Sequence, residues 1–110
     1  MKPLLLAVAL IAQAVHAAEF RAGAATSNIT PELGSSINGG FQDGKALVIH
    51  DELHARCLAL DDGQTKLVFV VADSCVIGRG IFDEAKKMVN AATGLPAENM
   101  MMSATHSHSC

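Results

Sequence analysis

The stretch KLVFVVADSCVIGRGIFDEAKKMVNAATGLPAENMMMSAT (residues 66–105) decides the fold, because its hydrophobic pattern changes twice. Residues 66–72 are almost wholly apolar, which is typical of a strand covered on both faces. Residues 81–94 then show helical spacing, and Gly94 followed by Pro96 is a stop signal. The face that this helix should bury consists of Ile81, Phe82, Ala85, Met88, Val89 and Ala92.

A second apolar strand follows the helix at residues 99–105. The order strand, helix, strand predicts a right-handed βαβ unit, with residues 66–72 and 100–104 parallel in one sheet. Ligands gather beyond the carboxyl ends of such strands. The GRG triplet at 78–80 lacks the third glycine of a dinucleotide-binding loop and is interpreted as a turn that leads into the helix.

The residues before this unit predict further strands. LHARCLAL (residues 53–60) is joined to residues 66–72 by DDGQT, a pattern that indicates a β-hairpin. Residues 18–45 are rich in Gly, Ser, Thr and Asn and are expected to form one short strand followed by a loop. The fold class is therefore predicted to be α/β, a mixed sheet with a β-hairpin and a βαβ unit.

The N-terminus, MKPLLLAVALIAQAVHAAEF, has the layout of a secretory signal peptide. Lys2 precedes a short apolar run, and Val15 and Ala17 fit the −3 and −1 positions of a cleavage site. The run is too short to span a bilayer comfortably. We therefore expect residues 1–17 to be a signal peptide, residues 18–110 to be one domain, and the protein to be secreted or periplasmic.

Composition excludes some functions. The chain has 110 residues, a formal net charge of −3 at pH 7 and no basic run, so nucleic acid is not an expected partner. Its three cysteines are an odd number for an exported chain. Cys57 and Cys75 lie in apolar runs and are interpreted as core thiols rather than as a disulfide framework. His54 is expected at the surface.

The chemically richest segment is SATHSHSC, residues 103–110. Two imidazoles one residue apart, at His106 and His108, can bind a metal ion, or one can bind while the other handles protons. Alone, the pattern also suits a solvated tail or surface histidines. Asp73 leaves the first parallel strand at the edge where His106 leaves the second, so its carboxylate is expected to support the site or to cap the following turn.

The segment SATHSHS resembles the S-A-T-H-T-H-S-G segment of the neutral/alkaline, non-lysosomal ceramidase family. Four further segments resemble motifs of that family in the same order. They are AGAATSNITPELG (residues 22–34), INGG (residues 37–40), IHDELHARCLALDDG (residues 49–63) and LVFVVADSCVI (residues 67–77).

The resemblance implies a zinc-dependent amide hydrolase that cleaves the N-acyl bond of ceramide or a related N-acyl lipid, with a membrane surface as the expected place of reaction. It makes His106 a zinc ligand and His108 an active-site residue, and it matches His50 to a histidine in the family's G-I-H motif. The family's remaining ligands, a His, a Glu and a Tyr, come later in its chains, and this sequence has no Tyr. Cys110 stands where the family has Gly. We therefore expect an N-terminal fragment of a larger catalytic domain that is inactive alone.

Two other hypotheses remain open from the sequence. One is an exported ceramidase-like module that binds a metal or another ligand without ceramidase activity. The other is a cysteine-dependent hydrolase that uses Cys75 or Cys110 with a histidine.

Overall fold

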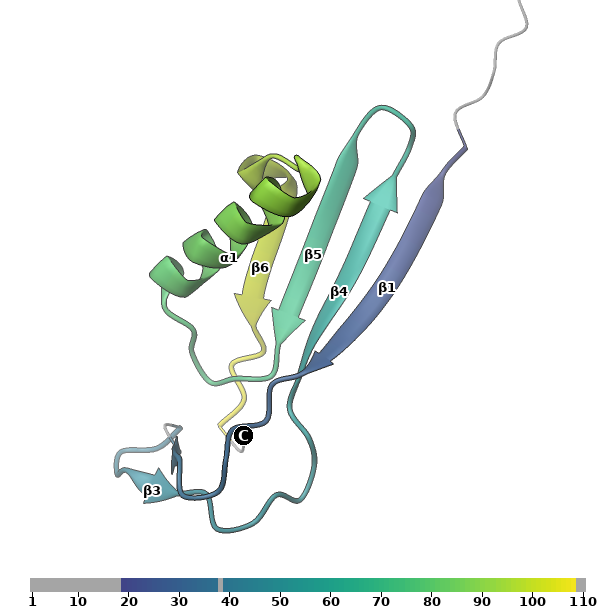
Figure 1. Ribbon diagram of the computed structural model, residues 1–110. Coiled ribbons are helices and arrows are strands. Elements are labelled where there is room, and N and C mark those ends of the chain that lie inside the picture. The colour runs from purple at the N-terminus through teal and green to yellow at the C-terminus, as the bar shows by residue number, and fades with distance from the viewer. Residues whose placement is uncertain (1–18, 38, 109–110) are drawn as a thin grey trace, which may run out of the picture.

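The computed structural model describes residues 19–37 and 39–108, so the expected signal peptide and Cys110 lie outside the described residues. The main element is a four-stranded sheet of order β1-β4-β5-β6, with one helix across it (Figure 1). Its strands are β1 (Arg21–Asn28), β4 (His54–Asp61), β5 (Lys66–Ala72) and β6 (Met100–Ala104). The predicted α/β class with a mixed sheet is confirmed. In the described part of the chain, no helix is long and apolar enough to cross a membrane.

The predicted hairpin is formed by β4 and β5, which pair antiparallel with Cys57 opposite Val70. Its turn is held by the Asp62 carboxylate, which accepts hydrogen bonds from the backbone N–H groups of Gln64 (2.9 Å) and Thr65 (2.7 Å). These two bonds lower the pKa of Asp62 below its ordinary value. Gly63 supplies the left-handed residue of the turn, at φ 86°.

The predicted βαβ unit is also present. Strand β5 leads into α1 (Arg79–Thr93), then into the 3₁₀ turn η1 (Ala97–Asn99), and β6 returns parallel to β5. The helix begins at Arg79 rather than at Ile81, directly after Gly78. It ends at the predicted place, because Gly94 adopts a left-handed φ of 74° and its N–H bonds to the Asn90 carbonyl.

The buried face of α1 is narrower than the sequence predicts. Phe82, Ala85 and Val89 are half-buried, but Ile81 and Met88 are 66% and 67% exposed. The half-buried residues follow the i, i+3, i+7 spacing of a narrow stripe. Ile81 and Met88 lie beside that stripe, where none of the described residues covers them.

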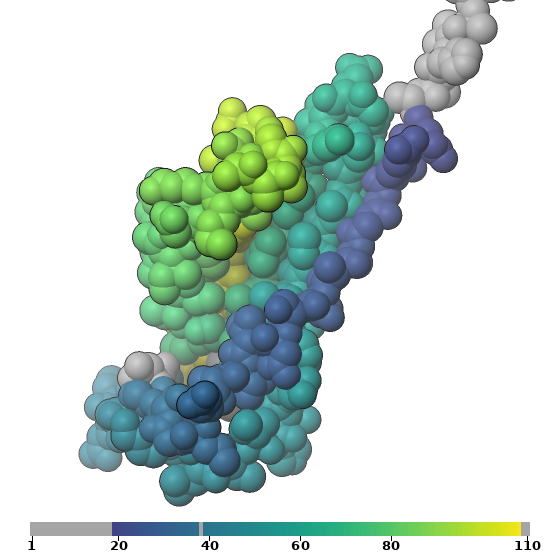
Figure 2. Space-filling view, in the orientation of Figure 1, coloured from purple at the N-terminus to yellow at the C-terminus, as the bar shows by residue number. Residues whose placement is uncertain are grey.

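The N-terminal segment differs in part from its prediction. The expected strand is β1, and it pairs antiparallel with β4 along its whole length. The residues expected to be loop contain a second sheet of two short strands, β2 (Ser36–Ile37) and β3 (Gly44–Lys45). This small sheet belongs to the segment between β1 and β4, residues 29–37 and 39–53, which we call the lobe. Figure 2 shows the lobe at the lower end of the main sheet, beneath the strand ends. Two-residue strands carry no periodicity that a sequence could reveal.

The two faces of the main sheet differ in burial. Helix α1 lies across one face, near β5 and β6 (Figure 1). By the strand registers, Ala72 and Met100 share a face, and they are the most buried apolar residues described, at 5% and 3% exposure. The opposite face carries apolar side chains that are 37–55% exposed, namely Leu58, Leu67, Val71 and Met101.

Candidate metal centre

The parallel pairing of β5 and β6 continues past the strand ends and positions His106. The Thr105 N–H bonds to the Ala72 carbonyl at 2.9 Å, and the His106 N–H bonds to the Ser74 carbonyl at 3.0 Å. His106 itself has φ 59°, a left-handed conformation that is rare for a residue other than glycine. Non-glycine residues held in this region cluster at functional sites.

Two backbone carbonyls fix the orientation of the imidazoles. His106 Nδ1 lies 2.9 Å from the Cys75 carbonyl oxygen, and His108 Nδ1 bonds to the Gly39 carbonyl oxygen. A carbonyl oxygen can only accept, so both Nδ1 atoms carry a proton, and in the neutral form of each ring Nε2 has a free lone pair. Such a bond from the other ring nitrogen is typical of metal-binding histidines.

The two free Nε2 atoms face each other at 3.3 Å, with the rings edge to face at 83°. In this tautomer no proton lies between them, so a cation or an external donor is needed to satisfy both lone pairs. Two nitrogen ligands of a tetrahedral zinc ion, at its usual zinc–nitrogen distance, lie about 3.3–3.4 Å apart. The observed spacing therefore fits a divalent cation.

A third donor belongs to the same cluster. The ligand atoms of Cys75, His106 and His108 all lie within 4.8 Å of one another. Cys75 is half-buried and both histidines are exposed. The set of one thiol and two imidazoles consists of groups that zinc prefers, so the residues present fit this ion.

Gly39 makes the approach of His108 possible. A Cβ atom on Gly39 would lie 2.9 Å from the His108 carbonyl oxygen and 3.1 Å from its Cα atom. Contacts under about 3 Å force a shift when the neighbour is backbone. The sequence signal for this contact is Gly39 itself, since glycine is favoured where another part of the backbone approaches closely.

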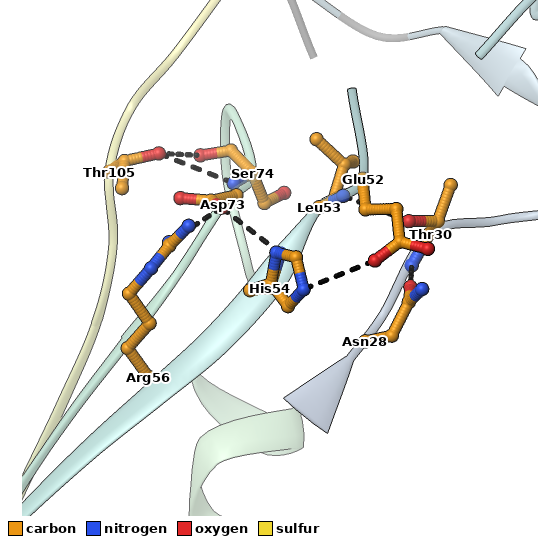
Figure 3. Close-up of polar contacts among 9 residues, drawn as sticks. All are labelled: Asn28, Thr30, Glu52, Leu53, His54, Arg56, Asp73, Ser74 and Thr105. Carbon is orange, nitrogen blue, oxygen red and sulfur yellow. Dashed lines mark hydrogen bonds and ion pairs between the residues drawn. The ribbon is translucent and has the colours of Figure 1, made fainter. Parts of the chain in front are cut away.

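Asp73 is at the predicted edge of the sheet but contacts other groups. Its Oδ2 accepts hydrogen bonds from the Arg56 side chain at 2.6 Å and from the His54 backbone N–H at 3.0 Å (Figure 3). The Arg56 guanidinium, followed by the His54 N–H, lowers the pKa of Asp73. Among the described residues, the Cys75 and Gly39 carbonyls contact the two imidazoles, and Asp73 joins the ends of β4 and β5. A role of Asp73 in supporting the site stays a prediction.

The Thr105 hydroxyl group links the two segments that follow β5 and β6. The Thr105 hydroxyl oxygen lies 3.4 Å from the Ser74 backbone nitrogen and 3.5 Å from the Ser74 carbonyl oxygen. Figure 3 draws both contacts as dashed lines. These contacts tie the segment that carries Cys75 to the segment that carries His106. The sequence indicated neither contact.

His50 lies in the loop before β4, where its Nδ1 pairs with the Asp51 carboxylate at 2.7 Å. Among the described residues, no hydrogen bond or ion pair joins it to His106 or His108. It does line a groove of about 690 Å³ together with Asp73 and Cys75. His54, expected at the surface, is half-buried and its Nε2 lies 3.4 Å from the Glu52 carboxylate.

The groove connects the lobe to the strand ends. Its walls are mostly apolar and include Ile29, Ile37, Val48, Ile49, Val76 and Ile77. Cys75 belongs both to this groove and to the donor cluster, whereas neither His106 nor His108 lines the groove. Cys57 and Cys75 are both free, and both are half-buried rather than fully enclosed in a core.

The fold and the cluster together define an α/β protein in which a parallel strand pair carries a histidine pair beyond its carboxyl end. Two solved structures are similar to this fold. A neutral ceramidase from Pseudomonas aeruginosa matches 81% of this chain with 26% sequence identity and a TM-score of 0.67. A ceramidase complexed with C2 matches 82% of the chain with 26% identity and a TM-score of 0.68.

The chain is neutral ceramidase-like over this span, which confirms the resemblance of its sequence motifs. It spans 15% of the length of each of these ceramidases. No family model matches the sequence. No curated protein matches it either.

Proposed function

We propose that this chain forms part of a zinc-dependent amide hydrolase that cleaves the N-acyl bond of ceramide or a related N-acyl lipid. The observation that carries the proposal is the Nε2 atom of His106, oriented by its Nδ1 contact to the Cys75 carbonyl and with the Nε2 of His108 3.3 Å away, beyond the parallel strands of a ceramidase-like fold. Zinc, when bound, would polarise the amide carbonyl and activate water.

Within this site, His106 would hold the ion through Nε2, because the Cys75 carbonyl keeps its Nδ1 protonated and its ring fixed. His108 would act beside it. Its Nδ1 is held by the Gly39 carbonyl, so its Nε2 can take up the proton of an attacking water or return a proton to the leaving amine.

The apolar groove supports a lipid substrate. A long acyl or alkyl chain needs a continuous apolar wall, which the isoleucine and valine side chains around Cys75 supply. The amide group of a lipid lying there would be close to the histidine pair. We propose that the protein is exported, that it meets its substrate at a membrane surface, and that the remaining ligands come from the rest of a larger catalytic domain.

The first test replaces His106 with Ala in the protein that carries this chain together with the remainder of its catalytic domain. Zinc content, measured by elemental mass spectrometry, and hydrolysis of a short-chain N-acyl sphingosine should be lost together. Stoichiometric zinc in the folded variant would contradict the assignment of His106. Zinc binding by the wild type without amide cleavage would favour a metal- or ligand-binding module instead.

The matched variant is His108→Ala. It should keep most of the zinc while turnover falls by about two to four orders of magnitude, the usual loss when an acid–base or oxyanion group is removed. Loss of zinc equal to that of His106→Ala would show that the two imidazoles share the ion, and the catalytic role of His108 would then be wrong.

A further inference from the structure

We propose that the Cys75 thiolate is a ligand of the same metal ion, beside His106. The proposal rests on the proposed function only in assuming that this cluster takes up a divalent cation. It adds a sulfur ligand that the resemblance to ceramidases does not imply.

The backbone places Cys75 for this role. Its carbonyl oxygen accepts a hydrogen bond from the His106 Nδ1–H at an N···O distance of 2.9 Å, so residues 75 and 106 are held next to each other. The bond from the His106 N–H to the Ser74 carbonyl, at 3.0 Å, fixes the same two segments one residue earlier. The Cys75 Sγ atom and one ring nitrogen of each histidine then lie within 4.8 Å of one another, and the two Nε2 atoms are 3.3 Å apart.

The distances are within reach of coordination. With the usual zinc–sulfur and zinc–nitrogen distances, a sulfur and a nitrogen on one tetrahedral ion lie about 3.5 Å apart. A Cys75 Sγ atom at the upper limit of 4.8 Å would have to move by about 1 Å to reach this coordination distance. Rotation about the Cα–Cβ bond of Cys75 can produce such a movement. Binding forms a sulfur–metal bond, and the thiol proton passes to solvent.

The second described cysteine provides an internal contrast. Cys57 is in the middle of β4, paired with Ala25 on one side and Val70 on the other. It is free and half-buried like Cys75 but does not belong to the donor cluster. Only Cys75 combines a free thiol with two neighbouring imidazoles in the described residues.

The test uses Co²⁺ as the probe, because a cobalt–thiolate bond gives an intense near-ultraviolet charge-transfer band that nitrogen ligands alone do not give. All proteins carry Cys110→Ser, so that two thiols remain, and each is titrated as the full chain. The parent and its Cys57→Ser variant should show the band. Cys75→Ser should lose it and bind Co²⁺ at least about tenfold more weakly, since even the loss of an outer-shell partner weakens metal affinity by this factor.

Metal-dependent protection from alkylation gives a second measurement that needs no Cys75 variant. In the parent, Co²⁺ should slow iodoacetamide labelling of Cys75, followed by peptide mass spectrometry, while the labelling of Cys57 stays unchanged.

Co²⁺ binding that is abolished by His106→Ala but lacks the charge-transfer band and protects neither thiol would overturn the sulfur ligand. The zinc site of the proposed function would then still stand. Failure of every form to bind Co²⁺ would also overturn the present proposal. The zinc content of the larger protein tests the proposed function separately.

Discussion

At the scale of single residues, the site depends on two backbone carbonyl oxygens that fix the tautomer of the His106 and His108 rings. The Cys75 and Gly39 carbonyl oxygens each accept a hydrogen bond from an Nδ1–H group and so leave the Nε2 atom of each ring available for other contacts. Neither contact requires a particular side chain at the accepting residue. This is why motifs made of histidines identify the ligands but not what orients them.

Gly39 is the more easily tested of the two positions. Gly39→Ala should weaken Co²⁺ binding about 10–100-fold, because its Cβ would meet the His108 backbone at 2.9 Å and displace the carbonyl that holds His108 Nδ1. Gly40→Ala is the control, since a Cβ there meets nothing within 4 Å and neither glycine has a positive φ. Isothermal titration compares the two, and equal affinities would contradict the role of Gly39.

The pairing of Asp73 with Arg56 predicts a pH dependence of stability. A carboxyl group whose pKa is lowered in the folded state stabilises it fully above the pKa of the unfolded chain, and this contribution is lost as the pH falls through the folded-state pKa. The free energy of unfolding should therefore decline as the pH drops below the ordinary value of 3.8.

Asp73→Asn should flatten this decline in acid, and Arg56→Gln should flatten it as well, because the guanidinium is the main cause of the lowered pKa. Urea unfolding at a series of pH values measures the effect. The variants should keep a residual slope, to which the hydrogen-bonded Asp62 contributes. A slope identical to that of the wild type in both variants would refute the pairing as the cause.

At the scale of elements, the crossover from β5 to β6 is set by where α1 stops. Gly94 ends the helix with a left-handed φ of 74°, which turns the chain into Leu95 and the 3₁₀ turn. The Asn90 side chain secures this turn by donating to the Leu95 carbonyl at 2.9 Å. The position of the helix end therefore decides where β6 begins and which of its residues reach the site.

Two glycines of this element should respond with opposite signs. Gly94→Ala should lower the free energy of unfolding by about 1–2 kcal/mol, the cost of a left-handed conformation for a residue with a Cβ. Gly80→Ala, inside the helix at a negative φ with open space around its Cβ, should raise it by about 0.5–1 kcal/mol. Urea unfolding at low protein concentration measures both, and a stabilising Gly94→Ala would contradict the assigned helix end.

At the scale of the whole molecule, one face of the sheet has no cover among the described residues. Leu58, Leu67, Val71 and Met101 share this face and are 37–55% exposed. Adjacent apolar side chains on a flat sheet face are typical of an interface. In the ceramidases that it resembles, this chain corresponds to 15% of a much longer polypeptide, which offers ample structure to cover such a face.

Taken by itself, the chain should therefore self-associate as its concentration rises. Replacing Leu58 and Met101 together by Ser should shift sedimentation velocity profiles towards the monomer, because this exchange removes apolar area from the uncovered face. The same exchange at Phe41 and Leu47, which lie outside the main sheet and are more exposed, is the control. A monomeric wild type at all concentrations, with a sharp reversible unfolding transition, would contradict the expectation.

The sequence by itself determined the elements whose signals are local. The apolar run of β5, the helical spacing of residues 81–94 and the Gly94 stop are each contained in a short window, and the βαβ handedness rule then placed β5 and β6 side by side. The histidine pair was visible for the same reason. Its position beyond the strand ends followed from topology rather than from any contact.

Only the tertiary structure decided the contacts across long separations. Gly39 and His108 lie 69 residues apart, and Cys75 and His106 lie 31 apart, so no periodicity links them. The sequence also could not show which residues of α1 stay exposed, because that depends on what packs against the helix. Nor could it show that the Asp73 carboxylate pairs with Arg56. A polar group bonds to the nearest complementary group in space, and that neighbour is known only once the strands have paired.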